Sequence, residues 1–147
     1  GFSNGASTAM MMLHEDLSDA SDSRLGGLDD MPTLSGGVAY YPGCGLEGLL
    51  GNNLSQSEVG RFYYPHAPLW VPHAEKDGLL DTCEELRDPQ VDVVADSYEV
   101  TQDMFELDVY SNAKHGFDVW FTGDSQANLD ARTDAQARTL AALEDWL

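Results

Sequence analysis

The first five residues, Gly1-Phe2-Ser3-Asn4-Gly5, form a Gly-x-Ser-x-Gly pattern. This pattern is typical of a nucleophile elbow, a sharp turn between a strand and a helix that presents one serine hydroxyl. We expect Ser3 to sit in a strained backbone conformation, flanked by glycines because a Cβ atom at Gly1 or Gly5 would collide in so tight a turn. The pattern therefore predicts that Ser3 is a nucleophile for acyl transfer.

A nucleophilic serine needs a base and an acid, and hydrolases built on this elbow place them downstream in the order Ser, Asp or Glu, His. Asp77 follows an apolar run at 69–71, and His115 follows an alternating stretch at 105–110. Each lies just past the carboxyl end of an expected strand, where open parallel sheets place their sites. We expect His115 to take the proton of Ser3, and Asp77 to hold the imidazole tautomer.

The same turn supplies a donor for the negative charge that develops during ester hydrolysis. The backbone N–H of Asn4 opens the following helix and is expected to point toward the hydroxyl of Ser3, as half of an oxyanion hole. Three aromatic residues flank the catalytic candidates: Phe2, Tyr40 and Phe117. They are expected to line a pocket for small apolar acyl groups, although aromatic residues are as a rule part of the core.

The elements that must position these side chains alternate between helix and strand. They are a helix over 6–14, strands over 37–41 and 67–71, a helix from the N-cap Asp81 to Pro89, a strand over 105–110 and a final helix. The order α-β-β-α-β-α predicts an α/β fold of about three parallel strands with flanking helices.

Three finer expectations concern the second half of the chain. The stretch 91–104 favours a helix, and the strict alternation of 105–110 predicts an edge strand with one wet face. The pattern Thr133-Asp134-Ala135-Gln136 is a capping box, which is expected to open the final helix. That helix would carry its leucines on one face: Leu140, Leu143 and Leu147.

Taken together, five features resemble the dienelactone hydrolase family of α/β-hydrolases. They are the Gly-x-Ser-Asn-Gly elbow, the strand and turn 38–45, the segment 77–83, the His-Gly-Phe-Asp tetrad at 115–118 and the final helix. The resemblance implies a carboxylic ester hydrolase that works through an acyl-enzyme and needs no cofactor. Dienelactone hydrolases proper use a cysteine nucleophile, so the serine at position 3 implies a general esterase for small, short-acyl esters.

An α/β-hydrolase has several strands before its elbow, so the resemblance implies the C-terminal half of that fold, as a single truncated or minimal domain over 1–147. Three strands would leave the first one, 38–41, with an unpaired apolar edge. Either the residues belong to a longer polypeptide or copies of the chain complete the sheet, and we expect a homo-oligomer. The family's second oxyanion donor comes from the absent half.

The strongly negative net charge of the chain limits the kinds of molecule that it is expected to bind. The chain has 26 acidic and 7 basic residues, a formal net charge of −19. Such a surface repels nucleic acid and anionic membranes, so we expect neither as a partner and a small-molecule ester as substrate. A surface poor in lysine and rich in aspartate is typical of salt-adapted proteins, and an ordinary acidic enzyme is the alternative. No stretch is long and apolar enough to predict a membrane span, and no secretory signal is expected.

Cys44 and Cys83 follow neighbouring strands, and two states remain open for them. A disulfide would indicate a secreted or periplasmic protein, whereas two buried thiols would fit the cytoplasm. The cysteines are far apart and the histidines scattered, so the spacing predicts no metal site. His73 lies close enough to Asp77 to line the site, with a structural hydrogen bond as its expected role.

Two other functions remain as alternatives to the esterase. A peptidase of the same fold is one, but no feature of the sequence provides recognition of a peptide chain. The other is a non-catalytic acidic interaction module, or a fragment of a larger hydrolase, whose exposed sheet edge binds a partner.

Overall fold

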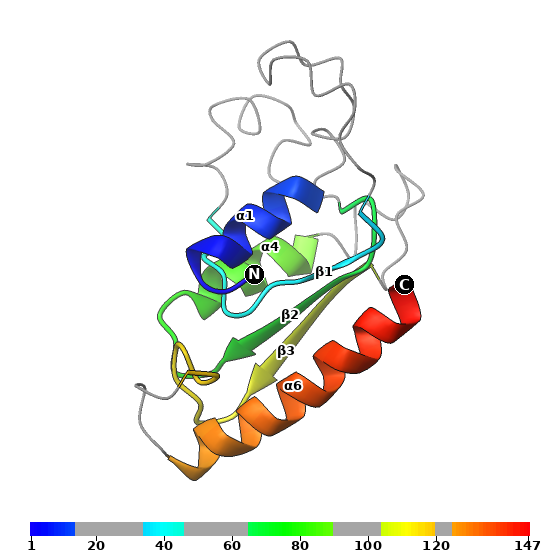
Figure 1. Ribbon diagram of the computed structural model, residues 1–147. Coiled ribbons are helices and arrows are strands. Elements are labelled where there is room, and N and C mark those ends of the chain that lie inside the picture. The colour runs from blue at the N-terminus through cyan, green and yellow to red at the C-terminus, as the bar shows by residue number, and fades with distance from the viewer. Residues whose placement is uncertain (14–33, 46–64, 90–103, 120–124) are drawn as a thin grey trace.

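The computed structural model describes residues 1–13, 34–45, 65–89, 104–119 and 125–147. Within these ranges the chain forms three helices around a three-stranded parallel sheet (Figure 1). The elements in order are α1 (Asn4–Leu13), β1 (Gly37–Val38), β2 (Leu69–Ala74), α4 (Leu80–Pro89), β3 (Phe105–Tyr110) and α6 (Gln126–Trp146). The α/β class, the parallel strands and the order α-β-β-α-β-α are as predicted. The expectations for 46–64 and 91–103 lie outside the described residues.

The central strand is β2, which pairs with β1 on one side and with β3 on the other. All six of its residues are buried, as in a strand that is covered on both faces. It continues past the predicted end at Val71. A proline lacks the N–H that a central strand donates, but the carbonyl of Pro72 still accepts the N–H of Tyr41 at 2.9 Å, so pairing continues through it.

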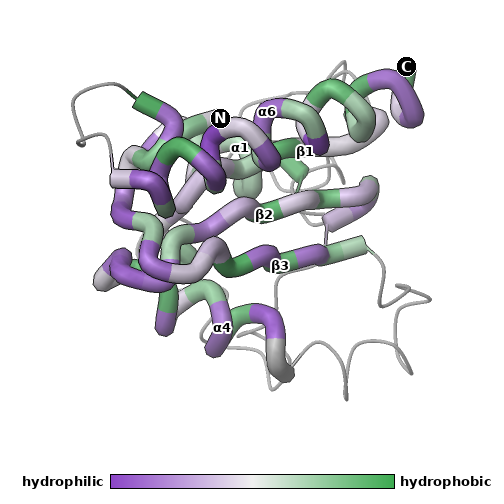
Figure 2. Tube along the Cα trace, turned by 90° about the horizontal axis from the view of Figure 1, so that it is seen from below, coloured by the Kyte–Doolittle hydropathy of each residue, from purple (hydrophilic) through white to green (hydrophobic). Residues whose placement is uncertain are grey.

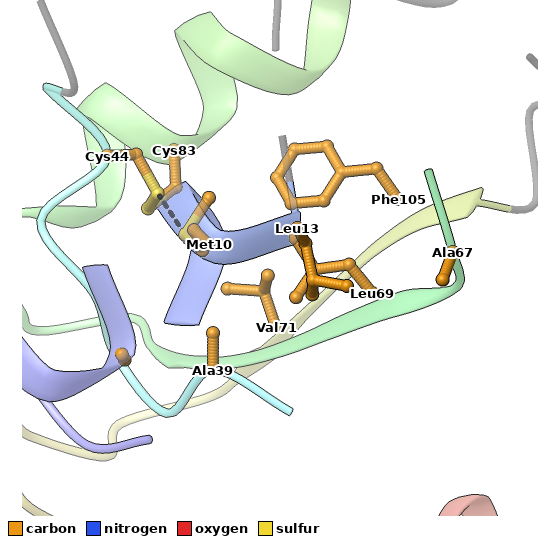
Figure 3. Packing of buried hydrophobic residues seen from close by; sticks show 10 residues of the cluster. Met10, Leu13, Ala39, Cys44, Ala67, Leu69, Val71, Cys83 and Phe105 are labelled. Atoms are coloured by element: carbon orange, nitrogen blue, oxygen red, sulfur yellow. Dashed lines mark hydrogen bonds between the residues drawn. A yellow bond between two sulfur atoms is a disulfide. The ribbon is translucent and has the colours of Figure 1, made fainter. Parts of the chain in front are cut away.

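One face of the sheet is covered by α1 and α4. Met10 and Leu13 of α1 pack against Leu69 and Val71 of β2, and Phe105 of β3 joins the same cluster (Figure 3). Residues at i and i+2 of a strand point to one face, and residues three apart on a helix share one side. This spacing explains why alternate residues of β2 meet a single stripe of α1.

The opposite face is covered by α6, and Figure 2 shows α4 and α6 on opposite sides of the strands. Ala131 of α6 packs in one cluster with Trp70 of β2. Arg138 of α6 donates to Glu106 at 2.7 Å and also to Asp108. The polar face of β3 therefore contacts an arginine of α6 rather than water alone, which corrects the prediction of a simply wet face.

The final helix begins earlier than its capping-box pattern predicted. Ser125 is the N-cap, and its hydroxyl accepts the N–H of Asn128 at 3.2 Å. Thr133 lies inside the helix and donates to the carbonyl of Leu129 at 2.9 Å, so the capping-box interpretation is wrong. The predicted leucine stripe is not the packed side, since Leu140 is 65% exposed.

The outer edge of the predicted strand 38–41 is occupied by the first residues of the chain. Phe2 and Tyr40 form a parallel bridge, Ser3 N–H donates to the carbonyl of Tyr40 at 3.0 Å, and Tyr40 N–H donates to that of Gly1 at 2.9 Å. The expectation of an unpaired edge along this strand is therefore wrong. On the other side of the sheet, β3 pairs with β2 alone among the described strands, as predicted for an edge.

Candidate active site

The turn at Ser3 has the backbone strain that the elbow pattern predicted. Ser3 has a φ of 50°, a left-handed conformation that residues other than glycine seldom adopt, and α1 begins at the next residue. A Cβ atom on Gly1 would lie 2.3 Å from the carbonyl oxygen of Gly5, so no side chain fits there. At Gly5 the explanation was wrong, because a Cβ atom would meet nothing within 4 Å.

The structure brings together the three side chains that the sequence singled out. His115 Nε2 lies 3.1 Å from Ser3 Oγ, and His115 Nδ1 lies 2.5 Å from Asp77 Oδ2. A carboxylate can only accept, so the proton of the neutral imidazole sits on Nδ1 and Nε2 accepts from the serine hydroxyl. Asp77 has a side chain that is 4% exposed, whereas that of His115 is 40% exposed. The carboxylate is thus shielded from solvent, whereas the imidazole is partly open to it.

Asp77 is fixed by the turn that leads from β2 into α4. Its second carboxylate oxygen accepts the N–H of Leu79 at 3.1 Å, and its own carbonyl accepts the N–H of Leu80 at 3.1 Å. The adjacent Lys76 donates its backbone N–H to the carbonyl of Ala113 at 3.0 Å. The loops that carry Asp77 and His115 are therefore bonded to each other through their backbones.

The loop that carries His115 is held by α6. Gly116 has a φ of 74°, which allows the sharp turn after the histidine. Arg132 donates from Nε to the carbonyl of Phe117 and from Nη2 to that of Val119, both at 3.2 Å. The position of His115 is thus set by the helix on one face of the sheet, while Ser3 is set by α1 on the other.

A second histidine lies behind the acid. His73 is fully buried; its Nδ1 accepts the N–H of Ala74 at 3.0 Å, so its Nε2 donates to the carbonyl of Pro42 at 3.2 Å. Its Nδ1 is 3.8 Å from Asp77 Oδ2. The predicted structural hydrogen bond is confirmed.

One candidate oxyanion donor stands at the start of α1. The N–H groups of Gly5 and Ala6 donate to the carbonyls of Phe2 and Ser3, both at 2.9 Å. The N–H of Asn4 has no such acceptor within the described part of the chain. A helix N-terminus with an open N–H favours negative charge, which suits the oxyanion of an ester intermediate.

The three aromatic candidates differ in exposure. Phe2 is 55% exposed and its ring lies 4.8 Å from that of Tyr40. Tyr40 and Phe117 are 4% and 0% exposed and belong to the core cluster beneath α6. Only Phe2 therefore presents its ring at the surface, and the structure favours the core alternative for the other two. Tyr41, whose ring is 4.6 Å from that of His115, was assigned no role from the sequence.

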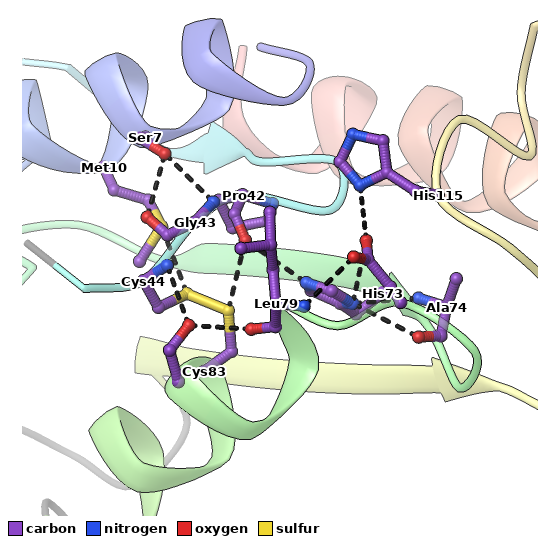
Figure 4. Close-up of a disulfide and its surroundings, with 12 residues drawn as sticks. Ser7, Met10, Pro42, Gly43, Cys44, His73, Ala74, Leu79, Cys83 and His115 are labelled. Carbon is purple, nitrogen blue, oxygen red and sulfur yellow. Dashed lines mark hydrogen bonds and ion pairs between the residues drawn. A yellow bond between two sulfur atoms is a disulfide. The ribbon is translucent and has the colours of Figure 1, made fainter.

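Cys44 and Cys83 form a disulfide, and the sulfurs are buried among α1, α4 and the turn after β1 (Figure 4). The same turn is tied to α1, because Ser7 Oγ donates to the carbonyl of Gly43 at 2.9 Å and lies 3.1 Å from its N–H. The turn also holds His73 through Pro42. The disulfide thus fastens α4 to this turn, and the hydrogen bonds of Ser7 fasten α1 to it.

No group of three or more His, Cys, Asp or Glu side chains in the described ranges could hold a metal ion. None of the helices in those ranges has the length and hydropathy needed to cross a bilayer.

Comparisons of the chain with protein-family models, with curated proteins and with solved structures gave no match. Function is therefore inferred from the geometry of the site.

Proposed function

We propose that the chain is a serine carboxylesterase of the dienelactone hydrolase type, built on the C-terminal half of an α/β-hydrolase fold, which hydrolyses small esters with short acyl groups. The observation that carries the proposal is the continuous path of hydrogen bonds from Ser3 Oγ through His115 to Asp77, with the serine at a positive φ. Parallel strands bring these segments to one edge of the sheet, and the two hydrogen bonds in series are what a nucleophile, a base and an orienting acid require.

The proposed reaction has two steps. Ser3 Oγ attacks the carbonyl carbon of the ester while His115 Nε2 takes the hydroxyl proton, and Asp77 stabilises the resulting imidazolium. Collapse of the intermediate breaks the bond between the carbonyl carbon and the alcohol oxygen. The alcohol takes the proton from His115 and departs, and the acyl group stays bonded to Ser3 Oγ. Water then gives a proton to His115 and attacks the acyl carbon, and the proton returns to Ser3 Oγ as the acid departs.

The Asn4 N–H is the first oxyanion donor of this proposal. Loss of one such donor costs on the order of 10²–10³ in rate, so a site with Asn4 alone is suited to activated esters. Phe2 is proposed to contact the acyl group, since its ring is exposed next to the nucleophile. A homo-oligomer remains a separate proposal, which molar mass measured by light scattering tests; the edge of 38–41 no longer supports it, because the first residues of the chain occupy that edge.

A labelling experiment tests the nucleophile directly. A p-nitrophenyl organophosphonate forms a stable adduct with an activated serine, and intact-mass spectrometry counts the adducts. One adduct per chain is expected, placed on Ser3 by peptide mapping, and none in Ser3→Ala. Ser35→Ala is the matched control, because Ser35 is exposed and outside the site, and it should label like the parent. Equal labelling of the parent and Ser3→Ala would contradict the proposal, and absence of an adduct in the parent would favour an interaction module.

A further inference from the structure

Tyr41 has a backbone conformation that a bulky residue rarely adopts. Its φ is 38°, and such strain costs of the order of 1–3 kcal/mol and is concentrated at functional sites. Only two other non-glycine residues in the described ranges have a positive φ: the nucleophile Ser3 and the exposed turn residue Asn112. Tyr41 is 3% exposed, and its N–H is bonded to Pro72 of β2. The strained residue is therefore firmly attached to the sheet.

The side chain of Tyr41 contacts both ends of the turn that carries the base. Its ring centroid is 4.6 Å from that of His115 with 60° between the planes, and 5.5 Å from that of Phe117. Its hydroxyl donates to Asp118 Oδ1. Burial, and then the bond to Asp118, raise the pKa of Tyr41, so the hydroxyl keeps its proton and stays a donor at neutral pH.

The hydrogen bonds of His115 leave one freedom that Tyr41 removes. Bonds to Ser3 and Asp77 hold the two ring nitrogens, but the imidazole can still shift together with the turn that carries it, and 40% of the side chain is open to solvent. A ring packed beside the imidazole and a hydrogen bond that fixes the turn limit this shift, which would otherwise take Nδ1 out of reach of Asp77. Misplacement of a reacting group by about 1 Å can cost on the order of 10²-fold in rate.

We propose that Tyr41 is a positioning residue: the bond from its hydroxyl to Asp118 holds both its own ring against the imidazole of His115 and the turn from which His115 projects. The catalytic consequence rests on the proposed esterase function. The immobilised imidazole is a property of the fold and is measurable without substrate.

The test compares Tyr41→Phe with Tyr110→Phe. Both variants keep a ring and lose a hydroxyl that donates to a carboxylate, since Tyr110 donates to Asp134 Oδ2 at 2.7 Å. Both tyrosines also contact Phe117, Tyr110 at 5.3 Å between centroids. Of the two, Tyr41 is the one whose ring packs against His115. Tyr110→Phe therefore controls for the loss of a phenol from the same aromatic cluster.

Two readouts are taken on folded protein. The first is the pair of ¹⁵N chemical shifts of the two His115 ring nitrogens. The two shift values differ widely when one tautomer is present, and they become similar when the tautomers interchange. In Tyr41→Phe they should approach each other, and in Tyr110→Phe they should match the parent. The second is ester hydrolysis, in which Tyr41→Phe should lower kcat about tenfold with little change in KM.

The outcomes separate the two proposals. If both variants show the parent's shifts and the same kcat, or if both change them equally, Tyr41 acts only as a core residue and the inference is overturned. If the parent neither hydrolyses esters nor labels at Ser3, the esterase proposal fails. In that case the ¹⁵N shifts alone decide: a change confined to Tyr41→Phe supports the positioning role, and unchanged shifts overturn it.

Discussion

Replacing Asp77 by asparagine changes one side of the acid from an acceptor to a donor. In the parent, one carboxylate oxygen accepts from His115 Nδ1 at 2.5 Å and the other accepts from Leu79 N–H at 3.1 Å. The N–H of Leu79 can only donate, so it selects the oxygen of the new amide and leaves the NH₂ group facing His115. Nδ1 must then accept, and the imidazole proton moves to Nε2.

An imidazole with its proton on Nε2 presents a donor to Ser3 Oγ, 3.1 Å away, and cannot take the serine proton. The wrong tautomer in a comparable triad lowers kcat by about 10⁴, which corresponds to about 5 kcal/mol of transition-state stabilisation. Stability should fall far less, because the bond to Leu79 is kept and loss of one charge-assisted hydrogen bond costs about 1–3 kcal/mol. Asp77→Asn should therefore be folded and nearly inactive.

The assay is p-nitrophenyl acetate hydrolysis, with urea unfolding of the same samples followed by circular dichroism. Asp81→Asn is the control, because Asp81 is an exposed carboxylate in the first turn of α4. Its kcat should stay within about twofold of the parent's, as expected for a surface change. A folded Asp77→Asn protein with kcat within about tenfold of the parent's would refute the tautomer argument.

Three further predictions concern stability. The double variant Cys44→Ala/Cys83→Ala removes a disulfide that spans a sequence separation of 39, and this should lower the free energy of unfolding in urea by about 4 kcal/mol. Each single variant also breaks the disulfide and should lose nearly as much stability. Small losses that add up in the double variant would show that the two cysteines are not bonded. Because the pKa of Tyr41 is raised in the folded protein, the unfolded chain loses the hydroxyl proton first as pH rises, and the free energy of unfolding should fall above about pH 10. Tyr41→Phe has no such proton, so between about pH 10 and about pH 11 its free energy of unfolding should fall by about 1 kcal/mol less than that of the parent. With a net charge of −19, added NaCl should raise the unfolding midpoint by screening self-repulsion, and a flat or falling midpoint would contradict salt adaptation.

The elements that the sequence predicts well are those with a strong local pattern. The limits of β3, 105–110, follow from alternation alone, and the turn at Ser3 follows from the Gly-x-Ser-x-Gly pattern, in which Gly1 but not Gly5 is required by a close contact. The triad order then placed Asp77 and His115 at neighbouring strand ends, and parallel strands bring such ends together. The local sequence pattern and the parallel order of the strands were therefore sufficient to predict that Ser3, Asp77 and His115 lie close together.

The remainder depended on tertiary contacts that no local pattern encodes. The early start of α6 was missed because Thr133 and Gln136 imitate a cap, while Ser125 fulfils that role. The end of β2 was missed because Pro72 is tolerated where its carbonyl still pairs. The role of Tyr41 depends on a positive φ and on a ring contact with a residue distant in sequence, neither of which the residue type predicts.

The most direct test of the central claim is hydrolysis of p-nitrophenyl acetate and butyrate by the parent chain and by Ser3→Ala, with molar mass measured on the same samples. The parent should hydrolyse both esters, and Ser3→Ala should retain only the background rate while keeping the same fold and mass. Equal rates in the two proteins would contradict the account, because the bonded Ser3, His115 and Asp77 would then have no part in hydrolysis.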